Sequence, residues 1–112
     1  MKLTQNIGRM LLGSFFLFSA IHSFFGFNDF VELVKSKNIP LPIIVSLIVL
    51  ICKLITGILI ISNDYENYNI SASIIFVFTV TIMYHNAFVD NTQFNNMMKN
   101  LAIIGGLMFL YK

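Results

Sequence analysis

Charge and cysteine are scarce in this sequence of 112 residues. Only 11% of the residues are charged and 57% are hydrophobic, whereas a typical soluble domain carries about 25% charged residues. A soluble fold of this size has too little interior to bury so much apolar surface, which excludes a water-soluble domain and a disordered chain. The net charge of +2 comes from scattered residues, and this excludes a nucleic-acid-binding protein.

Side chains that would support redox or metal chemistry are also lacking. The single cysteine, Cys52, excludes an internal disulfide, a paired-cysteine redox motif and a cysteine-based zinc site. No Asp or Glu lies within the long apolar stretches, so a histidine metal site would have no carboxylate support. We therefore expect no metal. The sequence has no Gly-rich phosphate loop and no nucleophile paired with a base. We therefore expect that the chain does not catalyse a reaction by itself.

What the sequence does contain is apolar residues in four long stretches. A membrane-spanning helix needs about 20 mainly apolar residues. The stretches cover residues 7–26, 41–62, 70–89 and 94–111, and short polar segments at 63–69 and 90–96 separate the last three. This pattern predicts an all-α membrane protein, a four-helix transmembrane bundle that forms a single domain over residues 1–112.

The connection between the first two stretches has a helical pattern of its own. Its apolar residues recur at the spacing of one helix face, namely at Phe27, Phe30, Val31 and Val34. Acidic residues come early and lysines late, which suits the dipole of a helix. We predict a short amphipathic helix in the membrane interface over residues 27–37; the alternative is an ordinary solvated loop.

Polar side chains near one leaflet are the first candidate site. A rise of about 1.5 Å per residue brings three groups to similar heights near the leaflet opposite the termini: His22, His85 with Asn86, and Lys99 with Asn100. Polar groups at membrane depth usually face a partner or a cavity. We expect these five side chains to line a pocket that fits a lipid headgroup or a quinone ring.

Two further cations lie within the apolar stretches. Lys53 is close to the midplane of the second stretch, with Thr56 one turn away. A lysine at this depth predicts a functional site by default; the alternative is that its side chain reaches to the interface or binds a lipid phosphate. Arg9 lies near the opposite face of the membrane, where we expect it to bind lipid phosphate.

The two histidines allow three interpretations. His22 and His85, at one height on two helices, are suited to be axial ligands of a b-type haem. Interfacial histidines more often make hydrogen bonds to backbone carbonyl groups or water, and this is the interpretation that we favour. Proton transfer to a quinone is the third.

Small residues in three of the stretches predict close helix packing. They are Gly8 and Gly13, Thr56–Gly57, and Gly105–Gly106. Small side chains allow two helix backbones to approach each other within a membrane.

Several segments together resemble the DoxX family of small four-helix membrane proteins. The run G-R-M-L-L-G at residues 8–13 and the pair of prolines at residues 40 and 42 are similar to the family's opening motifs. The runs T-I-M-Y-H-N at 81–86 and K-N-L-A-I-I-G-G-L at 99–107 are similar to its closing motifs. Two departures concern charge: Lys53 is found where the family often has a glutamate, and Ile21–His22–Ser23 where it often has a lysine.

The resemblance implies an association with membrane redox systems, such as subunits of quinol oxidases. We therefore predict a multi-pass accessory subunit of a quinone-linked oxidoreductase, with an oxidoreductase subunit or a second copy of the chain as its partner. Quinone is the predicted ligand, at His85, Asn86, Lys99 and Asn100. A scaffolding protein without redox chemistry and a b-type haem protein are the alternatives. Scarce alanine indicates an AT-rich genome, so the predicted location is a bacterial inner membrane or a viral or eukaryotic internal membrane.

Overall fold

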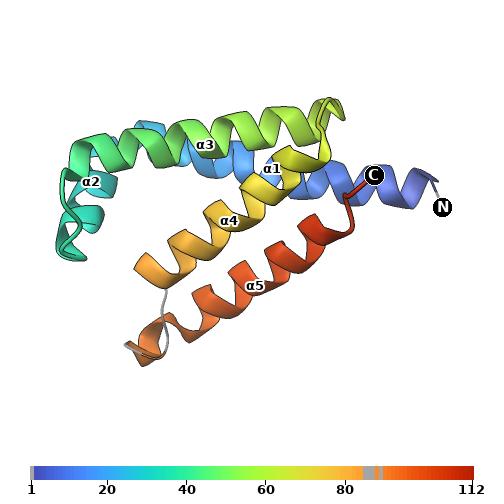
Figure 1. Ribbon diagram of the computed structural model, residues 1–112. Coiled ribbons are helices and arrows are strands. Elements are labelled where there is room, and N and C mark those ends of the chain that lie inside the picture. Colours follow the sequence, from blue (N-terminus) through green and yellow to red (C-terminus); the bar gives the residue numbers. More distant parts are fainter. Residues whose placement is uncertain (1, 85–87, 89) are drawn as a thin grey trace. The chain divides into compact units, whose positions relative to one another are not determined.

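The computed structural model of the protein describes residues 2–84, 88 and 90–112. The elements in these ranges are α1 (Lys2–Phe25), α2 (Phe27–Ser36), α3 (Pro42–Ser62), α4 (Asn67–Tyr84), the 3-10 helix η1 (Asn91–Gln93) and α5 (Phe94–Met108), as drawn in Figure 1. The chain divides into two compact units, Met1–Asp64 and Tyr65–Lys112. The predicted all-α class is confirmed for the described ranges.

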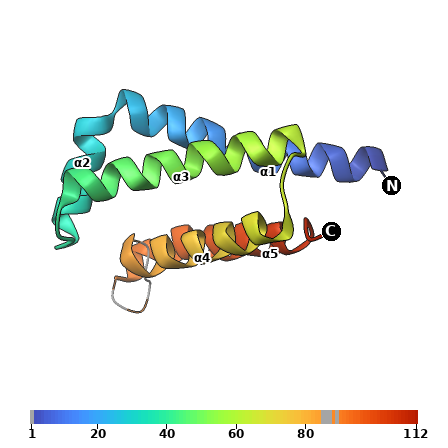
Figure 2. The ribbon, with the colours of Figure 1, turned by 45° about the horizontal axis from the view of Figure 1, so that its top comes forward.

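The first unit is built on the antiparallel pair of α1 and α3 (Figure 2). Each helix turns one face inward, and the buried residues recur at steps of three or four positions, apart from one gap of eight positions on α3, as one side of a helix requires. They are Gly13, Phe16, Ala20 and Ser23 on α1, and Ser46, Val49, Gly57 and Ile60 on α3. Most of the other large apolar side chains on both helices are exposed. The pair therefore has a narrow packing seam and a broad apolar outer surface.

Two glycines set the distance between α1 and α3. A Cβ atom on Gly57 would lie 2.8 Å from the backbone nitrogen of Leu17 and 3.0 Å from the carbonyl oxygen of Gly13. Backbone atoms cannot turn aside as a flexible side chain can, so only glycine fits at residue 57. The predicted close approach is confirmed at Gly13 and Gly57. Within its own unit, an added Cβ on Gly8 or on Gly105 would meet nothing within 4 Å, so neither glycine brings two helices of that unit together.

Helix α2 is the amphipathic helix predicted between the first two apolar stretches. Val34 is fully buried, Phe30 and Val31 are half-buried, and Asp29 and Glu32 are exposed. Its apolar side packs on α3, so this segment is a helix and not a solvated loop. Its position in a membrane interface stays a prediction.

The second unit is the antiparallel pair of α4 and α5. Its buried face consists of Ile70, Ser73, Val77 and Thr81 on α4 with Asn100, Ile104 and Leu107 on α5. Hydrogen bonds join the start of α4 to the end of the chain: the side-chain amide of Asn67 exchanges two bonds with the backbone of Lys112, at 2.8 and 3.1 Å. The hydroxyl of Tyr65 donates to the carbonyl oxygen of Leu110 at 2.8 Å. We call these three bonds the terminal clasp.

Helix boundaries depart from the apolar stretches by a few residues. Helix α1 begins at Lys2 and not at residue 7, because Thr4, Gln5 and Asn6 continue the helix without being apolar. The turn before α4 is shorter than predicted, since α3 ends at Ser62 with its C-cap Asn63 in the left-handed conformation, and α4 begins at Asn67. The ends of an apolar stretch are set by which side chains are hydrophobic, whereas the ends of a helix are set by backbone hydrogen bonds. The two sets of boundaries therefore differ by a few residues.

Among the residues that the structure describes, two helices are long and apolar enough to cross a membrane, at Leu3–Phe25 and Pro42–Ser62. The apolar helix Asn67–Met83 falls below that length. Helix α5 has 15 residues, about 22 Å of rise against a hydrocarbon core of about 30 Å. The apolar outer surface and these helices identify a membrane protein. Four crossings and a single four-helix bundle stay predictions.

Candidate functional site

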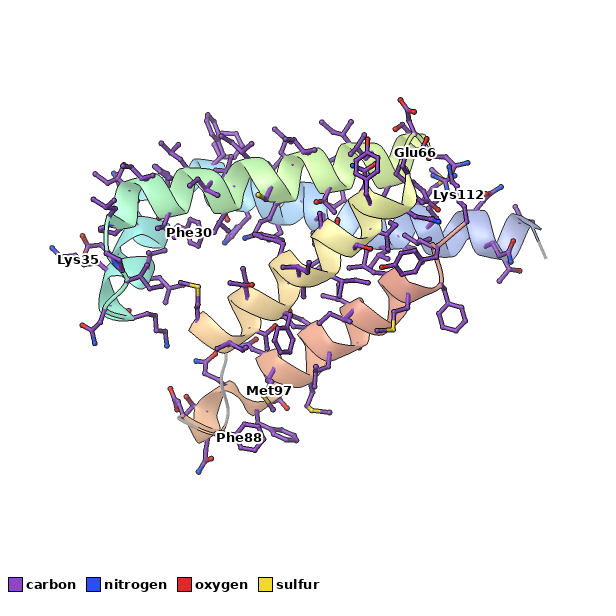
Figure 3. The ribbon with its side chains drawn as sticks, in the orientation of Figure 1. Phe30, Lys35, Glu66, Phe88, Met97 and Lys112 are labelled. Atoms are coloured by element: carbon purple, nitrogen blue, oxygen red, sulfur yellow. The ribbon has the colours of Figure 1, made fainter. Side chains whose placement is uncertain are left out.

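Lys53 lies at a corner where the three helices of the first unit meet. Its Nζ atom donates a hydrogen bond to the hydroxyl of Ser23 on α1, at 3.3 Å. The same atom lies 5.1 Å from the centre of the Phe30 ring on α2, within the range of a cation–π contact; Phe30 is labelled in Figure 3. Ser23 is buried, and Lys53 and Phe30 are half-buried. We call these three residues the Lys53 corner.

The ammonium group of Lys53 lies nearer to α2 than its own backbone does. Gly57 packs against Gly13 and Leu17, so the backbone of Lys53, one turn earlier on an antiparallel helix, is level with about residue 19 of α1. Ser23 is one further turn along, roughly 6 Å closer to α2. The side chain therefore extends from the middle of α3 toward the end of α1. That this direction leads to a membrane interface, the alternative given for Lys53, stays a prediction.

Arg9 holds the opposite end of the α1–α3 pair. Its Nη1 atom donates to the carbonyl oxygens of Ile60 and Ile61, at 2.6 and 2.7 Å. These oxygens belong to the last turn of α3, where carbonyl groups lack partners within the helix and the helix dipole is negative. The guanidinium is therefore a cap for α3. The binding of a lipid phosphate by Arg9 stays a prediction.

Only one of the two candidate haem ligands can be placed. His22 lies in the last turn of α1 and its side chain is exposed, while its neighbour Ser23 faces α3. His85 lies outside the described residues, as does Asn86. An axial ligand in a bundle core must face inward, so nothing in the part of the chain that the structure describes favours haem.

The two polar neighbours on α5 face different ways. Asn100 is 7% exposed and belongs to the buried face with Ile104 and Leu107, whereas Lys99 is exposed. Successive residues of a helix point about 100° apart, so both could not line one pocket from the buried side. Of the predicted lining, Asn100 alone is buried among the described residues.

The terminal clasp is a polar cluster that the sequence did not suggest. Besides the hydrogen bonds named above, the Nζ atom of Lys112 donates to the carbonyl oxygen of Tyr65 at 2.9 Å and lies 4.4 Å from the centre of that ring. Lys112 and the neighbouring Glu66 are labelled in Figure 3. The sequence feature that could have indicated the terminal clasp is the presence of Tyr65 and Asn67 at the start of an otherwise apolar helix. All of these contacts stay within the second unit.

Cys52 is half-buried on α3 as a free thiol. Within the described ranges, no three side chains of His, Cys, Asp or Glu converge as a metal site would require. Ser23 and Phe30, which contact Lys53, were not among the predicted site residues. The sequence feature that could have indicated that Ser23 faces α3 is its position ten residues after Gly13, on the same face of α1.

Comparison with known protein families gives a match. The family model described as DoxX matches residues 4–86, which covers α1 to α4 and ends at the predicted His85–Asn86 pair. The K-N-L-A-I-I-G-G-L run at residues 99–107 lies beyond the matched region. No curated protein and no solved structure matches the chain.

Proposed function

This chain belongs to the DoxX family, and from that we propose that it is an accessory membrane subunit of a quinone-linked redox complex. Its family and its membrane-length helices are the observations that carry the proposal. The chain contributes binding surface and does not catalyse a reaction by itself. Its partner is a soluble or membrane oxidoreductase subunit, with a second copy of the chain as a further partner. The membrane is a bacterial inner membrane or an internal membrane of a virus or eukaryote.

The proposed quinone site is on the second unit and centres on Asn100. A quinone ring has two carbonyl oxygens that accept hydrogen bonds, and a side-chain amide donates them. Asn100 is buried beside apolar residues, the combination that ligand sites commonly offer: an apolar wall with a few polar groups. We propose that His85 and Asn86 complete the lining of this site.

The experiment compares two asparagines on the same helix. Asn100→Ala removes the buried amide, and Asn95→Ala removes an exposed one as the matched control. Each full-length variant is purified from membranes, and the quinone extracted with it is measured by chromatography. We expect the Asn100 variant to retain less quinone than the Asn95 variant. No quinone in any sample, together with unchanged membrane redox activity after deletion of the chain, would reject the proposal.

A second function is favoured by the contacts of the cations in the first unit. Arg9 and Lys53 both connect helices, as they would in a scaffolding membrane protein without redox chemistry. Proteomics of purified membranes or particles separates the two functions. A co-purifying oxidoreductase supports the accessory subunit, and structural membrane proteins alone support the scaffold.

A further inference from the structure

We propose that the end of the second unit that carries the terminal clasp lies at the headgroup level of a phospholipid bilayer, and that the outer face of α4 contacts acyl chains. Three exposed residues of α4 carry the proposal, namely Tyr68, Ile75 and Ile82, which we call the outer stripe. The occupant of this stripe is lipid, rather than a second copy of the chain or a partner subunit. The stripe is separate from the buried face that contains Asn100, so the proposal does not rest on the quinone site.

The outer stripe changes in character along the helix. Tyr68, Ile75 and Ile82 follow one another at intervals of seven residues, nearly two full turns, so their side chains point the same way. They are 72%, 65% and 51% exposed. The stripe begins with an aromatic ring that bears a hydroxyl and continues with hydrocarbon alone. Tyrosine is enriched where headgroups meet acyl chains, so this order of side chains matches the passage from headgroups into the bilayer core.

The other side chains at this end have the same mixed character. Tyr111 is exposed, and its hydroxyl shares a hydrogen bond of 2.8 Å with that of Ser71, about one turn after Tyr68. Glu66 and Lys112, labelled in Figure 3, are exposed at the same end, whereas α4 itself contains no charged residue. Exposed rings and charges therefore gather at one end of an uncharged helix, as they would beside lipid headgroups.

Tyr68 differs from the other two tyrosines at this end in the partner that its hydroxyl can have. The hydroxyl of Tyr65 donates to Leu110, and that of Tyr111 is bonded to Ser71. Across residues 2–84, 88 and 90–112, no hydrogen bond joins the hydroxyl of Tyr68 to the protein. Phosphate and ester oxygens of lipids accept hydrogen bonds, and a phenol donates them. The Tyr68 hydroxyl is therefore suited to a headgroup partner.

The size of the side chains favours lipid over another helix. Helices that pair within membranes often present small residues, which let two backbones approach, as Gly13 and Gly57 do in the first unit. The outer stripe presents large residues instead, and Phe78 beside it is also exposed. Acyl chains are as apolar as these side chains, and because they are flexible they can fill the spaces between them.

The chain contains no tryptophan, so a single one can be introduced as a fluorescent probe of depth. Tyr68→Trp, Ile75→Trp and Ile82→Trp are made in the full-length protein, which is placed in phosphatidylcholine vesicles. Quenching by lipids that carry bromine at known depths gives the distance of each probe from the bilayer midplane, and quenching by iodide reports its exposure to water. Phe16→Trp, at a buried position of α1, is the control for a shielded probe. Circular dichroism verifies that each variant is folded.

The expected depths follow from the geometry of the helix and the bilayer. Seven residues of helix rise about 10 Å, and the headgroup boundary is about 15 Å from the midplane of a core about 30 Å thick. We expect the probe at position 68 about 15 Å from the midplane, and those at 75 and 82 within about 8 Å of it.

Two results would overturn the proposal. Equal depths at the three positions would mean that α4 lies along the membrane surface. Quenching at positions 75 and 82 as weak as at position 16, by both bromine and iodide, would mean that protein covers the outer stripe. Neither result involves quinone, so this proposal and the proposed function can fail separately.

Discussion

The two units of this protein hold a pair of helices together in different ways. In the first unit, glycines at positions 13 and 57 bring two backbones into direct contact, and cations lie toward both ends of the seam. In the second unit, larger side chains separate α4 from α5, and hydrogen bonds of the terminal clasp join one end. Without a hydrophobic force between helices in lipid, close packing and polar contacts provide the stability.

This difference in packing determines which substitutions each unit tolerates. The contact between the backbones of α1 and α3 requires that Gly57 has no side chain, and no change of rotamer could make room for one. A single added Cβ atom should therefore destabilise the first unit. The terminal clasp consists of several separate bonds, and each can be lost alone. We therefore expect substitutions in the glycine seam to have larger effects than substitutions in the clasp.

The largest effect is expected from Gly57→Ala. Its Cβ would lie 2.8 Å from the Leu17 backbone, so α1 and α3 must move apart. Overpacking of this kind costs about 1–3 kcal/mol, and we expect a value in the upper part of that range. Equilibrium unfolding in detergent gives the free energy, and faster alkylation of Cys52 reports opening of the first unit.

Gly8→Ala is the matched control for this substitution. A Cβ on Gly8 meets nothing within 4 Å, and alanine is favoured over glycine in a helix by up to about 1 kcal/mol. The control should therefore leave the unfolding free energy unchanged or raise it. Equal losses in both variants would contradict the assignment of the seam to Gly57.

Arg9→Gln should have the next largest effect. It removes two hydrogen bonds from a charged donor to the last turn of α3, and such bonds contribute about 1.5–3 kcal/mol. Hydration at the helix end will offset part of this, so we expect a loss of about 1–2 kcal/mol. Hydrogen exchange should increase at Asn63 and Asp64, whose amides donate to the same end of α3. Lys35→Gln, at an exposed lysine, is the control; a loss in it as large as that of Arg9→Gln would refute a specific cap.

The sequence predicted the helices better than their contacts. Hydropathy located α1, α3, α4 and α5 to within a few residues, and periodicity identified α2, because both signals are local properties of a helix face. Which faces meet depends on pairs distant in the chain. Ser23 and Lys53 are thirty residues apart, and their contact follows from the crossing at Gly13 and Gly57, a geometric fact that residue types alone do not contain.

The candidate pocket is a second case in which residue types do not tell which side chains face the same way. The rise per residue gives the height of a residue along a helix, and by height Lys99 and Asn100 belong together. The direction of the side chains around the helix separates the two, because Asn100 is buried and Lys99 is exposed. Asn100 lies four and seven residues before the buried Ile104 and Leu107 and therefore shares their face of α5.

Tyr65→Phe tests the terminal clasp of the second unit and should have a smaller effect. The hydroxyl that is removed donates to Leu110, and the ring stays in its buried place. A single neutral hydrogen bond contributes about 1 kcal/mol. Tyr68→Phe is the control, because Tyr68 is 72% exposed. Hydrogen exchange should rise in residues 109–112 in the first variant only; a rise in both would mean that the clasp does not depend on this hydroxyl.

Thr81→Val should have the smallest effect, although Thr81 is buried. Its Oγ1 atom donates to the carbonyl oxygen of Val77 in the same helix, at 2.7 Å. That oxygen is also a backbone acceptor within α4, and valine preserves the shape of threonine, so the loss is a bond within one helix and not between two. We expect a change below about 0.5 kcal/mol, matching Thr79→Val, where the equivalent bond to Ile75 is exposed. Substitutions at the surface usually change the unfolding free energy by no more than about 0.5 kcal/mol. A loss above about 1.5 kcal/mol at Thr81 alone would show that this hydroxyl also stabilises the pairing of α4 with α5. The second unit would then depend on its buried polar face as strongly as the first unit depends on Gly57.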